Sequence, residues 1–219
     1  MKKVVVATLV ASVLTGCGAV NNALTEKKKT VEYYRIFDIK TDSNRTAVID
    51  AASDGLGENV NSANEKTPIP SFSTPPEQPG RFKLVNPFAG SKLASLAAMS
   101  GQSFKMAVCD GAVWTAQATR EVTGSDSLHL TACLWQYKGG YHLDAYASFT
   151  KEEGGLMQIS RSMASAMVGT PEEWTEKTFL DIVRKIKSDT HAKVKYLEGY
   201  PKLQGTPWLD TGDKIEGQG

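Results

Sequence analysis

Residues 128–150, LHLTACLWQYKGGYHLDAYASFT, decide the fold because they contain two β-strand patterns joined by a tight turn. Apolar and polar residues alternate on both sides of Gly139-Gly140, which is the pattern of a strand with two unlike faces. A two-residue glycine turn is typical of a β-hairpin, and here it pairs Lys138 with Tyr141. The stretch therefore predicts an antiparallel hairpin with a computable register.

This register separates an apolar face from a polar and aromatic face. On the apolar face, Leu134 lies opposite Ala145. The pairs on the other face are Tyr137 with His142, Trp135 with Asp144, and Cys133 with Tyr146. Tyrosine and tryptophan are enriched at protein interfaces, so the candidate binding face consists of Trp135, Tyr137, His142, Asp144 and Tyr146. The alternatives are a solvated or partner-covered sheet face, and a small acid–base patch at His142 and Asp144.

Two more strands are predicted before the hairpin, at residues 103–109 and 113–122, separated by the turn signal Asp110-Gly111. Together the four segments predict a four-stranded antiparallel meander. We expect an α+β fold in which helices pack on the apolar face of this meander.

A helix is predicted after the meander, starting at Thr170-Pro171-Glu172-Glu173. This sequence has a capping threonine, a proline in the first turn and a carboxylate three residues after the threonine. Apolar residues then follow at helical spacing: Phe179, Ile182, Val183 and Ile186. The stripe predicts an amphipathic helix that covers the sheet.

The remaining segments complete one expected domain over residues 31–200. Its predicted elements are a strand at 31–39, a helix from Asp42 or Ser43 through Ala52, a proline-rich loop at 58–81, short helices at 92–99 and 159–169, and an edge strand at 192–197. Residues 201–219 are predicted as a tail with one docking segment, Pro207–Leu209.

The N-terminus carries a separate signal. Lys2 and Lys3 precede a ten-residue apolar run, which is too short to span the roughly 30 Å hydrocarbon core of a membrane as a helix. Leu14-Thr15-Gly16-Cys17 follows directly. This quartet resembles the lipobox of bacterial lipoproteins, in which the cysteine is lipidated and becomes the new N-terminus.

The resemblance implies that residues 1–16 are a signal peptide and that Cys17 carries acyl chains that attach the protein to a membrane. Residues 17–30 would then form a flexible tether. Gly18 replaces the aspartate that resembles an inner-membrane retention signal, so the resemblance favours the outer membrane and a domain in the periplasm. The alternative is a plain secretory signal that contains a cysteine by chance.

Composition excludes several classes of protein. The 219 residues include 25 basic and 24 acidic side chains, and removal of residues 1–16 would change the formal charge from +1 to −1. A nearly neutral chain lacks the positive field of a nucleic-acid-binding module, so we expect no nucleic-acid partner.

Two cysteines remain beside Cys17. Cys109 and Cys133 are expected to form a disulfide in an oxidising compartment. Sequential strand order conflicts with this bond, because it would place the two residues on the first and third strands, about 9.6 Å apart. The bond therefore requires Cys109 at a bent strand end or a different strand order.

Catalytic motifs are missing from the sequence, which has no nucleophile elbow, zinc-protease motif, Cys-x-x-Cys pair or phosphate-binding loop. In the predicted register His129 and His142 are separated by about 27 Å along the strands, too far to share a metal. We expect no cofactor and no metal.

Three functions are compatible with these patterns. The first is a non-enzymatic envelope lipoprotein that binds an envelope partner through the polar-aromatic face. The second is a periplasmic enzyme or small-ligand-binding protein that uses His142 and Asp144. The third is a structural role in a secretion or assembly complex that contains lipoproteins.

Overall fold

The structure, a computed structural model, describes residues 27–60, 62–92, 95, 105–122, 125–153 and 169–209. The predicted signal peptide and Cys17 lie outside these residues. The predicted helix at 159–169 and most of the one at 92–99 also lie outside them.

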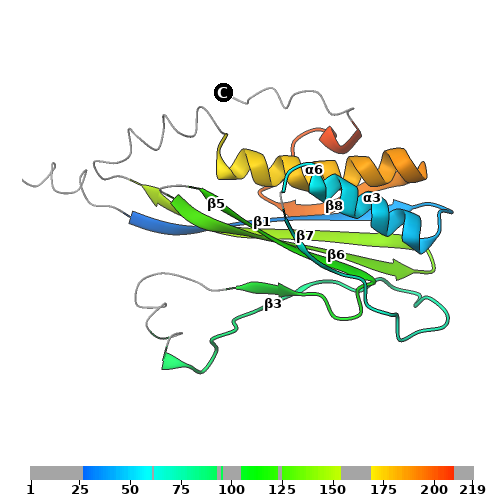
Figure 1. Cartoon of the computed structure of the whole chain (residues 1–219), viewed down its shortest axis with the longest axis horizontal. Coiled ribbons are helices and arrows are strands. Elements are labelled where there is room, and N and C mark those ends of the chain that lie inside the picture. The colour runs from blue at the N-terminus through cyan, green and yellow to red at the C-terminus, as the bar shows by residue number, and fades with distance from the viewer. Residues whose placement is uncertain are drawn as a thin grey trace, which may run out of the picture.

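A six-stranded antiparallel sheet forms the centre of the fold, with helices on one face and a smaller two-stranded sheet on the other (Figure 1). The elements are β1 (Lys27–Lys40), α3 (Arg45–Gly57), β2 (Asn64–Lys66), β3 (Lys83–Val85), β4 (Met106–Val108), β5 (Trp114–Val122), β6 (Ser125–Tyr137), β7 (Gly140–Glu153), α6 (Pro171–Thr190), β8 (Lys193–Tyr200) and η1 (Pro207–Leu209). The strand order is β2-β5-β6-β7-β1-β8, and β3 pairs with β4. The predicted α+β class, with an antiparallel sheet and helices packed against it, is confirmed.

The β6–β7 hairpin has the predicted faces but a different register. Its turn consists of Lys138 and Gly139, so Tyr137 pairs with Gly140. Gly140 is part of the strand because β1 passes closely beside it. A Cβ atom there would lie 2.3 Å from the carbonyl oxygen of Ile39, and its φ of +132° favours glycine. Each residue of β6 therefore pairs two residues earlier on β7 than predicted, and each side chain stays on its predicted face.

The sheet also differs from the predicted meander at its first strand. β5, β6 and β7 are consecutive neighbours as expected. The segment predicted as a strand at 103–109 instead contributes β4 to the second sheet, where Met106 pairs with Val85. The place next to β5 belongs to β2, where Lys66 pairs with Thr115, and β1 lies on the other side of the hairpin, next to β7.

β1 lies in the sheet between β7 and the edge strand β8. It contains the predicted strand 31–39 and begins earlier, at Lys27. Residues 27–30 pair with residues 150–153 of β7, so the end of the predicted tether belongs to the sheet. β8 pairs with β1 and extends the predicted edge strand at 192–197 to Tyr200.

The helices α3 and α6 cover the apolar face, which contributes Leu134, Leu143 and Phe149 to the core. α6 begins as predicted, with reciprocal hydrogen bonds between Thr170 and Glu173 that form a capping box. α3 begins later than expected because Asn44, rather than Asp42 or Ser43, provides the cap.

The C-terminal segment packs against the same layer. In η1 the ring of Trp208 lies 6.0 Å from Phe37 and 5.3 Å from Tyr196, and Arg184 of α6 donates two hydrogen bonds to the carbonyl oxygen of Pro207. The predicted docking segment therefore lies against the core.

Candidate functional site

The predicted binding face is the sheet face opposite the helices. Trp135, His142, Asp144 and Tyr146 are all buried there, and Tyr137 is half-buried. Trp135 lies opposite His142 rather than Asp144, and Tyr146 lies opposite Thr131. The structure thus brings these side chains onto one face and covers most of them with the chain itself.

Residues 80–82, here called the strap, form the first part of this cover. Gly80 lies against the indole of Trp135, where an added Cβ atom would be 2.3 Å from Nε1. The ring of Phe82 lies 5.7 Å from Tyr146 and 6.2 Å from Tyr34. Only glycine fits at the first position, so the strap lies flat on the sheet.

His142 and Asp144 form a buried polar pair on this face, and Asp144 contacts the strap. His142 Nδ1 lies 3.1 Å from Asp144 Oδ1, but the two atoms are not aligned for a hydrogen bond. The other oxygen, Oδ2, accepts a hydrogen bond from the backbone N–H of Phe82 at 3.0 Å and lies 3.6 Å from Arg81 Nε. The Asp144 carboxylate therefore binds the strap through Phe82 and Arg81 and attaches it to the sheet.

The disulfide between Cys109 and Cys133 forms the second part of the cover, with a Cα–Cα distance of 6.0 Å. Cys109 directly follows β4, which lies on the second sheet, so the separation expected from a sequential meander does not apply. Trp135 Nε1 donates to the carbonyl oxygen of Asp110 at 2.9 Å, next to the bond. The disulfide and this hydrogen bond fix residues 109–110 over β6.

Acidic side chains of β1 bind the tyrosines at both ends of the face. Tyr146 donates to Glu32 Oε1 at 2.7 Å, and Tyr137 donates to Asp38 Oδ1 at 2.5 Å. Burial, followed by the hydrogen bond to Glu32, raises the pKa of Tyr146; burial and Asp38 do the same for the pKa of Tyr137. Both phenols therefore stay protonated as hydrogen-bond donors near neutral pH.

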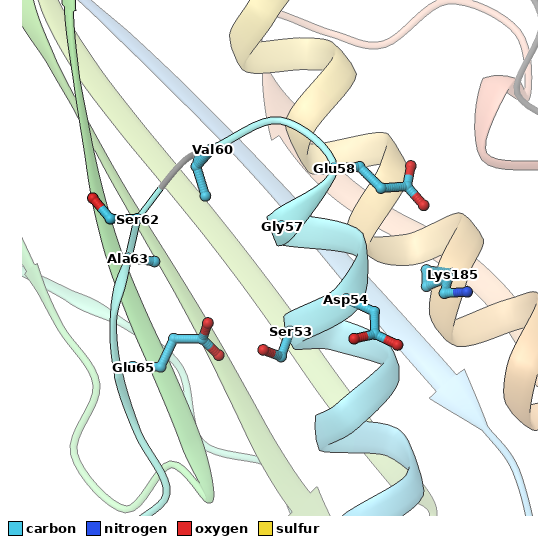
Figure 2. Close-up of a pocket in the computed structure, with 9 residues that line it drawn as sticks. All are labelled: Ser53, Asp54, Gly57, Glu58, Val60, Ser62, Ala63, Glu65 and Lys185. Carbon is cyan, nitrogen blue, oxygen red and sulfur yellow. The ribbon is translucent and has the colours of Figure 1, made fainter.

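An accessible recess lies elsewhere among the described residues, between α3 and the β2–β5 edge of the sheet. It consists of two hollows of about 600 and 660 Å³ that share Glu58, Val60 and Ser62. Figure 2 shows the first hollow, in which Ser53 of α3 and Glu65 of β2 point toward one another. No sequence pattern predicted this recess, because its walls come from segments without a shared motif.

The second hollow is bordered by an aromatic and a cationic side chain. The guanidinium of Arg120 lies 5.3 Å from the centre of the Trp174 ring. Trp174 Nε1 in turn donates to the carbonyl oxygen of Asn59 at 3.0 Å. The side chains of Asn59 and Lys177 both bind Asp181 of α6, so this wall is fixed to the helix.

The contribution of Asp181 to the stability of the fold depends on pH. Burial opposes ionisation, but hydrogen bonds from Lys177, Asn59 and Arg184 outweigh it and hold the pKa of Asp181 below 3.8. A carboxyl whose pKa is lowered by folding stabilises the protein at pH values above its unfolded pKa. This contribution is lost as the pH falls through the folded pKa.

We therefore expect Asp181→Asn to lower the free energy of unfolding by about 2 kcal/mol at pH 7, since several charged hydrogen bonds are lost. The difference from wild type should shrink as the pH falls below 3.8. Urea unfolding at a series of pH values measures it. The control is Asp189→Asn on the same helix, which should have a smaller effect because Asp189 is exposed. A difference that grew in acid would contradict the assignment.

Within the described residues, no three His, Cys, Asp or Glu side chains gather as ligands for a metal ion. His129 is exposed on β6 while His142 is buried on β7. The same part of the chain contains no helix of the length and hydropathy needed to cross a membrane.

Comparisons of the chain with protein families, with curated proteins and with solved structures find no match.

Proposed function

We propose that this protein is a lipoprotein of the cell envelope, attached by Cys17 to the periplasmic face of the outer membrane, with a non-enzymatic binding or assembly role. The observation that supports it most directly is the arrangement of the three cysteines. Cys109 and Cys133 are joined in the folded domain. Cys17 is the third, and it stands at the lipidation position of the lipobox.

Membrane attachment is tested by replacing this cysteine. A single acyl chain gives marginal membrane binding and several chains give stable attachment, so Cys17→Ser should move the protein out of the membrane fraction of Gram-negative cells. Incorporation of labelled palmitate should be lost in the same variant. The matched control is Cys109→Ala/Cys133→Ala, which should keep both the label and the membrane fraction. Retention of Cys17→Ser in the membrane would overturn the proposed attachment.

The recess beside β2 supports the binding role. It is open along the edge of the domain, while the predicted binding face lies beneath the strap. A photo-crosslinking residue at Ser62, which lines both hollows, should trap a specific envelope protein in intact cells. The same residue at the buried Tyr146 should trap none. No specific protein at Ser62 would argue against a partner in this recess.

The alternative, a periplasmic enzyme or small-ligand-binding protein, has less support. It requires a substrate to reach His142 and Asp144, but both side chains are buried and the strap is bound to Asp144. Activity that depends on His142 would nevertheless favour this alternative, and His142→Ala is the variant that tests it.

A further inference from the structure

A small lobe projects from the sheet on the side away from the helices (Figure 1). We define the lobe as residues 83–92 and 105–108, which include β3 and β4. Large apolar side chains are concentrated on it. Within the described residues, four of the eight exposed side chains of this kind belong to the lobe: Leu84, Val85, Phe88 and Met106. Val85 and Met106 are direct cross-strand neighbours and are 38% and 44% exposed.

The same part of the sequence is basic. The lobe contains three lysines, Lys83, Lys92 and Lys105, and no acidic residue. Lys83 is 73% exposed and has one carboxylate nearby, Asp110, at 3.7 Å. Exposed apolar side chains next to basic residues are typical of segments that lie at the interface of an anionic membrane.

The lobe is also close to the strand by which the chain enters the domain. Lys105, the residue before β4, donates to Glu32 Oε2 of β1 at 3.0 Å. Lys27, where β1 begins, is five residues before Glu32 in the same strand. Figure 1 shows residues beyond β3 extending toward the end of the sheet where β1 begins.

The length of the chain before β1 limits how far this end can be from the membrane. Nine residues separate Cys17 from Lys27. Even when fully extended, this segment spans at most about 36 Å. A lipid on Cys17 would therefore keep the lobe near the bilayer.

We propose that the lobe contacts the lipid surface, with Val85 and Met106 among the headgroups and the exposed Lys83 and Lys92 on anionic lipids. The contact rests on the proposed lipid attachment and adds a second point of contact to it. The domain is then held in one orientation, with the β6–β7 turn away from the bilayer.

The proposal is tested in intact cells with the full, lipidated chain that carries a photo-crosslinking residue at position 85 or at position 69. Ile69 is the matched control because it is apolar and 94% exposed. It lies between Lys66, which pairs with Thr115, and Pro76, which accepts a hydrogen bond from the backbone N–H of Lys138. These contacts place it toward the opposite end of the sheet from Lys27.

We expect lipid adducts at position 85 and none at position 69. Protein adducts at position 85, equal lipid labelling at both positions, or no adduct at position 85 would overturn the lobe contact. Formation of the Cys109–Cys133 bond, checked by mass, verifies that each variant folds. Membrane release of Cys17→Ser is measured separately, so failure of the lobe contact and failure of the lipid attachment remain distinguishable.

Discussion

Replacement of Cys109 and Cys133 by alanine is expected to lower the free energy of unfolding by about 3.5 kcal/mol, because the bond closes a loop of about 25 residues. For a domain of this size, the loss corresponds to roughly 10 °C in the melting temperature. Calorimetry of both proteins under oxidising conditions measures it. In the variant, residues 109–110 should no longer be held over β6. Faster hydrogen exchange of the Trp135 indole N–H, which donates to Asp110, would report this loss.

The matched control is a reducing agent. It should lower the melting temperature of the wild type toward that of the double variant and leave the variant unchanged. A melting temperature that was the same with and without the bond would contradict its structural role. Two free thiols in the protein isolated from the cell envelope would contradict the bond itself and the periplasmic location.

This bond also explains where sequence reasoning reached its limit. The number of cysteines and the compartment expected from the N-terminal signal predicted the pair, and the structure contains the bond. Strand order opposed it, because consecutive alternating segments are usually neighbours in one sheet. Nothing in the alternation of residues 103–109 distinguishes a strand of the main sheet from one in a second sheet above it. The separation of these layers depends on tertiary contacts such as Lys105–Glu32.

The hairpin illustrates the same limit on a smaller scale. Alternation predicted which side chains share a face, since a shift by one pair moves two residues and preserves each face. The register itself depended on whether Gly140 belongs to the turn or to the strand. That choice is made by the approach of Ile39 from β1, a contact more than 100 residues away in sequence.

The sequence predicted which residues share the candidate binding face, but it did not predict that most of them are buried. Polar and aromatic residues do occupy one face of β6 and β7. Their alternation cannot reveal that Gly80 and Phe82 cover them, because the strap lies in a proline-rich segment with no periodic pattern. A polar sheet face therefore indicates either a solvated surface or a second layer, and the sequence contains no signal that separates the two.

The second large effect is expected at Arg35, which lies on the helix side of β1 and is 2% exposed. Its guanidinium makes two hydrogen bonds to the carboxylate of Glu176 on α6 and donates to the carbonyl oxygen of Tyr34 at 2.8 Å. Removing one partner of a buried ion pair leaves the other charge uncompensated. We expect Glu176→Ala to lower the free energy of unfolding by about 3 kcal/mol, measured by urea denaturation.

The two partners should respond unequally. Glu176 is 17% exposed, so water can solvate its carboxylate when Arg35 is removed. Arg35→Met should therefore lower the free energy of unfolding by less than Glu176→Ala does. The double variant Arg35→Met/Glu176→Leu should recover most of the loss, because no buried charge remains unpaired. Glu172→Ala, in the first turn of the same helix, removes an ion pair with Lys151 that is half-exposed, and should cost less than about 1 kcal/mol. Equal losses for Glu172→Ala and Glu176→Ala would show that burial of Arg35 does not determine the stability of the contact between α6 and β1.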